Sequence, residues 1–287
     1  MPAAPDVLIA ILLATLVLVL GETLRALLTG ELFVPSQPRS RLQFDWVVLA
    51  AALCFILLNV IPLLVQPFFA GKGSEKHEAA ITGDAVGDPL KEPEAREKRP
   101  PSSRLIEAEI VSRFVIVGVL ISVIAVRRRN RLSDYGFDSR GWLSEVRFGG
   151  LGFLASLPFV IAIILLTAHW RTPETQNPLL ILLHETGSDR TLAEVVFAAV
   201  ISAPLSEELL FRVAFQGPLE ARLPLSWAIT IPTFVFAGVH GLHDALPLLP
   251  LALVLGALYH LRRSYVAIVT AHACFNAAFL ILALSQR

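Results

Sequence analysis

Long apolar runs separated by short polar segments dominate the chain. The hydrocarbon core of a bilayer, roughly 30 Å thick, is crossed by a helix of about 20 mostly apolar residues. Each such run must be helical, because hydrocarbon offers no water to satisfy the backbone polar groups. The pattern therefore predicts an all-α, multi-pass transmembrane bundle of about eight helices. The predicted spans are Val7–Leu28, Trp46–Phe69, Glu109–Val126, Phe148–His169, Leu192–Phe215, Ser226–Leu242, Ala245–Leu261 and Tyr265–Leu284.

One polar segment, residues 71–103, is long enough to divide the chain. It is rich in Lys, Glu, Asp, Pro and Gly and lacks apolar periodicity, which is typical of a disordered linker. It separates a two-span N-terminal unit, residues 1–70, from a six-span unit, residues 104–287.

Composition agrees with a membrane environment. Hydrophobic residues make up 55% of the chain and charged residues 17%, against about a quarter charged in ordinary soluble domains. The net charge is zero, so we expect the lipid bilayer, and no nucleic acid, as a partner. The excess of Arg in alternate loops predicts that both termini lie outside the cytoplasm. If the protein is bacterial, the membrane in question is the cell membrane.

Three groups of polar residues lie inside apolar runs after residue 200. An ionisable side chain costs roughly 2.5–3.5 kcal/mol at the centre of a spanning helix, so each group requires an explanation. In the first group, Glu208 and Arg212 are four residues apart and can form an ion pair on one helix face. Glu207 points about 100° away and needs a different partner, and a general base is one use for it. A similar pair, Glu109 and Arg113, lies at a span edge where a plain ion pair is a sufficient explanation.

The second and third groups contain the other residues that water activation requires. Phe236 and His240 precede a turn, and His272 and Asn276 share one face of the last predicted span. Each group by itself could serve packing, because such side chains hydrogen-bond across helices. Two versions of the chemistry stay open for the combination. In one, a divalent metal, with zinc as the expected ion, binds to Glu207, His240 and His272.

In the other version no metal is needed. Glu207 and His240 then activate water directly, while His272 and Asn276 donate hydrogen bonds to the oxyanion. The predicted span edges place the acid and the two histidines at different depths in the membrane. A single site requires either tilted or longer helices, or different span edges.

The three motifs, EExxxR at Glu207, FxxxH at Phe236 and HxxxN at His272, occur in this order. Together they resemble the CPBP family of intramembrane peptidases, which includes the type II CAAX prenyl endopeptidases and the bacterial Abi proteins. The resemblance covers roughly residues 191–284 and implies an intramembrane endopeptidase that hydrolyses a peptide bond of a membrane-associated protein or peptide.

The resemblance also implies roles for individual residues. Water would be activated by Glu207 and His240, and the oxyanion would be stabilised by His272 and Asn276. The supporting residues would be Glu208, Arg212 and Phe236. The alternative is a catalytically inactive scaffold, an immunity factor or a transporter with the same fold, and the complete set of motif residues favours the peptidase.

Overall fold

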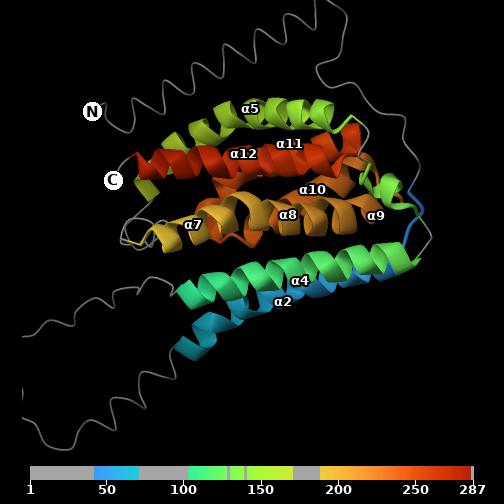
Figure 1. Ribbon diagram of the computed structural model, residues 1–287, viewed down its shortest axis with the longest axis horizontal. Coiled ribbons are helices and arrows are strands. Elements are labelled where there is room, and N and C mark those ends of the chain that lie inside the picture. Colours follow the sequence, from blue (N-terminus) through green and yellow to red (C-terminus); the bar gives the residue numbers. More distant parts are fainter. Residues whose placement is uncertain (1–41, 71–102, 128–129, 139–140, 171–187, 286–287) are drawn as a thin grey trace, which may run out of the picture.

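The computed structural model describes residues 42–70, 103–127, 130–138, 141–170 and 188–285, and all regular secondary structure in these ranges is helical (Figure 1). The predicted all-α membrane bundle is confirmed. The predicted first span, residues 7–28, lies outside the described residues, and eight spans are not confirmed. Residues 71–102 of the predicted linker also lie outside them, while Ser103 is the first residue of a helix.

Two long helices form one side of the bundle. Helix α2 (Trp46–Ala70) lies along α4 (Ser103–Arg127), and both pack against the helical segment formed by residues 189–220 (Figure 1). Val48 and Ala52 of α2 are completely buried. They belong to the same apolar core as residues of the last two helices, so α2 packs as part of the bundle.

The opposite side of the bundle is formed by α5 (Trp142–Thr167), α11 (Leu242–Arg262) and α12 (Tyr265–Leu284), which pack against one another (Figure 1). Helix α10 (Leu225–Gly238) packs mainly on α11. A Cβ atom at Gly149 of α5 would lie 2.5 Å from the carbonyl oxygen of Ala267. The missing side chain therefore allows α5 to approach α12, the helix that carries His272.

A continuous helical path between these two sides is named here the central helix, residues 189–220. It consists of α7 (Asp189–Phe197), the π-helical turn η4 (Ala198–Ser202), α8 (Ala203–Glu208), the π-helical segment η5 (Leu209–Gln216) and α9 (Gly217–Glu220). Ser188 caps its start by accepting a hydrogen bond from the Thr191 amide. Short π-helical insertions are frequent at functional sites, and here they enclose the two adjacent glutamates.

The turn between α11 and α12 is held against a short helical turn, η1 (Leu132–Tyr135). The Tyr265 amide donates a 3.0 Å hydrogen bond to the Gly136 carbonyl. Gly136 has a φ of +97°, and a Cβ there would lie 2.7 Å from the Arg263 carbonyl oxygen. Both observations require glycine at this position. This contact fixes where α12 begins.

Within the described residues, four helices are long and apolar enough to cross a membrane: Arg104–Arg127, Trp142–Thr167, Asp244–Arg262 and Tyr265–Leu284. Large apolar side chains such as Val126, Leu166 and Ile281 are mostly exposed on the outer surface of the bundle. Lipid is the solvent in which such a surface is stable. The chain is therefore a membrane protein, while the location of its termini stays a prediction.

Candidate active site

The two adjacent glutamates of α8 point to different partners. Glu208 is completely buried, and its Oε2 lies 3.4 Å from Arg212 Nε. This contact confirms the predicted ion pair. The other oxygen, Oε1, lies 2.8 Å from Nδ1 of His272, which comes from α12. Glu208 therefore connects the central helix to α12 within the core.

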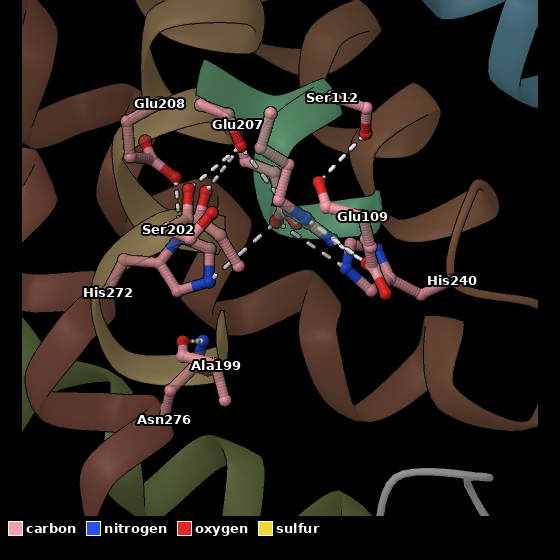
Figure 2. Close-up of polar contacts among 12 residues, drawn as sticks. Glu109, Ser112, Ala199, Ser202, Glu207, Glu208, His240, His272 and Asn276 are labelled. Atoms are coloured by element: carbon pink, nitrogen blue, oxygen red, sulfur yellow. Dashed lines mark hydrogen bonds and ion pairs between the residues drawn. The ribbon is translucent and has the colours of Figure 1, made fainter. Parts of the chain in front are cut away.

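Glu207 faces both histidines. Its Oε2 lies 3.7 Å from His240 Nε2 and 3.9 Å from His272 Nε2. Figure 2 shows the carboxylate between the two imidazole rings. These separations exceed the usual hydrogen-bond range, so a small molecule such as water can contact the oxygen and a ring nitrogen together. The structure thus brings together the three groups that the sequence places in different spans.

The partners of the histidines determine which ring nitrogen carries the proton. His240 Nδ1 lies 2.7 Å from the Phe236 carbonyl oxygen, which can only accept, so Nδ1 is the donor. In the same way, His272 Nδ1 donates to the Glu208 carboxylate. In the neutral ring, each Nε2 then presents a lone pair toward Glu207. This arrangement is typical of histidines that accept a proton or bind a metal.

Phe236 packs against both histidines of the site. Its ring centroid lies 4.8 Å from that of His240 and 5.7 Å from that of His272. The guanidinium of Arg212 lies 5.3 Å from the same centroid. The side chain is completely buried. Phe236 therefore holds both imidazoles in place by contact and also accepts the hydrogen bond from His240.

Asn276 lies one turn along α12 from His272 but makes a different contact. Its Nδ2 donates a 2.7 Å hydrogen bond to the carbonyl oxygen of Ala199, within the π-helical turn η4. Figure 2 shows Asn276 beside Ala199, away from the Glu207 carboxylate. The observed contact joins α12 to the central helix, and the oxyanion role implied by the resemblance stays a prediction.

Arg113 of α4 is a site residue that the sequence interpretation missed. Its Nη1 lies 2.6 Å from Glu207 Oε1 and 3.3 Å from Ser206 Oγ. The ion pair with Glu109 is present, with Nη2 at 2.7 Å from Oε1. The interpretation of this pair as a plain ion pair was nevertheless wrong, because the guanidinium also reaches the candidate base. The only signal in the sequence was a charged pair beside an apolar run.

A cavity of about 250 Å³ lies beside Glu207. Apolar side chains such as Ile56, Ile116 and Phe211 form part of its wall, from α2, α4 and η5, and His240 also lines it. His272 is buried, with 3% of its side chain exposed. One side of Glu207 therefore faces the cavity, and the other side faces His272 in the core.

The predicted span edges were wrong around this site. Helix α10 ends at Gly238, so His240 lies in the turn that follows, although a span was predicted to continue to Leu242. The central helix extends beyond both ends of the predicted span 192–215. His240 therefore approaches Glu207 from the turn after α10, at 3.7 Å.

The metal version of the site requires three side chains that can bind one ion together. The residue types of Glu207, His240 and His272 are those of a zinc site. However, in the part of the chain that the structure describes, no group of three or more His, Cys, Asp or Glu is arranged to hold a metal ion. Arg113 also places a positive charge on Glu207. As arranged, these residues do not fit a metal, and zinc stays a prediction.

Comparison with known families agrees with the motifs. Residues 189–278 match the model of the family described as type II CAAX prenyl endopeptidase Rce1-like. The three motifs all lie inside this range, and the match confirms the resemblance to that family. Helices α2, α4 and α5 lie outside the matched range. Comparisons with curated proteins and with solved structures gave no match.

Proposed function

We propose that this membrane protein is an endopeptidase that hydrolyses a peptide bond at or within the bilayer, with Glu207 as its general base. The proposal depends on one observation above all: a carboxylate oxygen faces two imidazole Nε2 atoms beside a cavity. The family match supports hydrolysis of a peptide as the reaction. We propose the substrate to be a membrane-associated protein or peptide.

The first step is the activation of water. Glu207 Oε2 and His240 Nε2 are both acceptors, since Nδ1 of His240 donates to Phe236. Between them they can accept both hydrogens of one water, which leaves the lone pairs of its oxygen directed toward a substrate carbonyl. As the oxygen attacks the carbonyl carbon, one proton passes to Glu207. When the C–N bond breaks, that proton passes to the leaving nitrogen.

His272 has a different role in this proposal. Its Nδ1 bonds the Glu208 carboxylate, which holds the ring with Nε2 directed toward Glu207. When Nε2 carries a proton, His272 can donate from it to the oxyanion that develops on the substrate carbonyl. Arg212 neutralises Glu208 within the core, and Asn276 holds α12 at the π-helical turn.

The test is a cleavage assay with purified protein in detergent and in liposomes. A panel of fluorogenic peptides, farnesylated and unmodified, is incubated with wild type, Glu207→Gln, His240→Ala and His272→Ala. We expect the wild type to cleave at least one peptide, and each substitution to reduce the rate by about 10²–10⁴-fold, the usual contribution of a general base. Thermal unfolding and gel filtration show whether each variant folds.

The alternative functions predict a different result. A scaffold, immunity factor or transporter has no hydrolytic activity of its own, so changing Glu207 does not alter the rate of cleavage. If all three folded variants cleave at the wild-type rate, the activity comes from a contaminant or another site, and the proposal is wrong.

A further inference from the structure

Helix α4 contributes to the site although it lies outside the range that matches the family model. Its Arg113 makes contacts with two carboxylates. Nη1 lies 2.6 Å from Glu207 Oε1, whereas Nε and Nη2 lie 3.2 and 2.7 Å from Glu109 Oε1. One oxygen of Glu109 thus accepts from two adjacent nitrogens of the guanidinium.

These contacts determine the orientation of the candidate base. A guanidinium is planar, so the two bonds to Glu109 fix the direction of the remaining nitrogen, Nη1. Nη1 then binds Glu207 by Oε1 only, which leaves Oε2 directed at the imidazoles of His240 and His272. The two oxygens of Glu207 therefore have separate partners, one on α4 and the other on α10 and α12.

We propose that Arg113, oriented by Glu109, is a positioning residue for hydrolysis, holding Glu207 so that Oε2 faces the attacking water. This inference rests on the proposed function. The pair is only partly exposed, with 22% of the Arg113 side chain and 15% of the Glu207 side chain accessible. In such surroundings an ion pair is stronger than one in bulk water.

Arg113 also affects the charge of the site. The charged and titratable groups that contact Glu207 are Arg113 from α4, His240 after α10 and His272 from α12, with Glu109 and Glu208 behind them. Loss of the guanidinium makes the anionic form of Glu207 less favourable. The acid limb of the pH–rate profile should then move to higher pH.

A purely structural role for Arg113 would be that of a tether between α4 and the central helix. The chain offers a matched control for that role. Arg190 of α7 also contacts one carboxylate of its own helix and one of α4, Glu194 at 2.7 Å and Glu107 at 2.6 Å. Its side chain is 76% exposed. Arg190→Met thus removes a similar bridge without changing any contact of Glu207.

The experiment measures kcat and KM across pH 5–9 for wild type, Arg113→Met, Arg113→Lys, Glu109→Gln and Arg190→Met, using a peptide that the wild type cleaves. A misplacement of about 1 Å costs on the order of 10²-fold, so we expect this loss in kcat for Arg113→Met, with KM little changed. Compared with Arg113→Met, Arg113→Lys should return the acid limb of the pH–rate profile to its wild-type position. It should restore only part of kcat, because the lysine ammonium is a single point of charge. Glu109→Gln should lose about tenfold, and Arg190→Met less than twofold.

Two results would overturn the inference. One is a wild-type kcat and pH profile for folded Arg113→Met; the other is an equal loss for Arg190→Met and Arg113→Met. If Arg113→Met does not fold, the inference is tested by the kcat values of Arg113→Lys and Glu109→Gln. Wild-type values of kcat in both variants exclude a positioning role for Arg113. Glu207→Gln, measured in parallel, separates the two proposals: full activity there contradicts the proposed function itself.

Discussion

The central helix carries a second carboxylate cluster, thirteen residues after Glu207, and both clusters combine a glutamate with arginine and histidine. Glu220 Oε1 accepts a 2.9 Å hydrogen bond from Gln216 Nε2. Its Oε2 lies 2.7 Å from Arg263 Nη2 and 3.1 Å from His260 Nδ1. Both oxygens thus have direct partners, and only 7% of the side chain is exposed.

Glu207 differs in the partners of one oxygen. Arg113 binds Oε1 directly, whereas the ion-pair partners of Oε2 among the described residues are the two imidazole nitrogens, at 3.7 and 3.9 Å. A cavity lies beside Glu207. The residue types therefore do not distinguish a structural ion cluster from a reactive one. The distinguishing features are an oxygen without a close partner and access from a cavity.

The largest effect on stability is expected at Glu220. Glu220→Gln leaves the Arg263 guanidinium buried without its counterion, and breaking a buried ion pair costs about 3–5 kcal/mol of unfolding free energy. Chemical unfolding in detergent micelles measures this loss. Glu207→Gln is the contrast and should lower stability much less while abolishing cleavage. Equal stability of Glu220→Gln and wild type would contradict the comparison.

The Glu220 cluster should also make stability depend on pH. Burial opposes ionisation of Glu220, but the contacts with His260, Arg263 and Gln216 outweigh it, so the pKa of this carboxyl lies below its ordinary value. Its stabilising contribution is complete above the unfolded-state pKa of about 4.3 and is lost as pH falls through the folded-state pKa. The difference in melting temperature between wild type and Glu220→Gln should therefore shrink on acidification. A constant difference down to low pH would exclude this cause.

Asn276→Ala tests whether the last motif acts on the substrate or on the fold. Removing the donor leaves the Ala199 carbonyl unpaired, and we expect a loss of about 1–3 kcal/mol of unfolding free energy. The kcat at saturating peptide should fall by less than about tenfold, compared with the 10²–10³-fold loss for an oxyanion donor. The opposite pattern, unchanged stability with a hundredfold loss, would support the role implied by the resemblance.

The smallest effect is expected from metal removal. The described residues provide no group of three metal-binding side chains in place, so dialysis against EDTA should leave the cleavage rate within about twofold. Activity that is lost and then restored by Zn²⁺ would instead establish the metal version, with Arg113 displaced from Glu207. Metal analysis of the dialysed protein serves as the control.

Helical periodicity explains which parts of the site could be predicted from the sequence. The Glu208–Arg212 pair and the shared face of His272 and Asn276 follow from a spacing of four residues, which needs no knowledge of the tertiary structure. The contact of His272 with Glu208 depends on how α12 packs on the central helix, so spacing could not predict it. The partner of Arg113 is 94 residues away in the sequence, and no local pattern indicates it.

The span edges predicted from hydropathy were wrong for another reason. Hydropathy treats polar residues as the limits of a span, although the central helix begins and ends with residues whose charges are paired. The predicted spans Ala245–Leu261 and Tyr265–Leu284 likewise leave Arg263 in a turn between them. The structure shows Arg263 and His260 mostly buried against Glu220. A paired charge costs less to bury than an isolated one, and a residue-by-residue scale has no information about partners.

The π-helical turn η4 has a consequence for variation in this chain. A turn of this kind holds one more residue than an α-helical turn. Deleting a single residue from Ala198–Ser202 would therefore convert this turn to an α-helical one and leave the two halves of the helix in nearly the same relative orientation. The α-helical segment Ala203–Glu208 has no extra residue to lose, and a deletion there rotates one side against the other by about 100°. The π-helical turn thus tolerates a one-residue change in length without a change in the direction of Glu207.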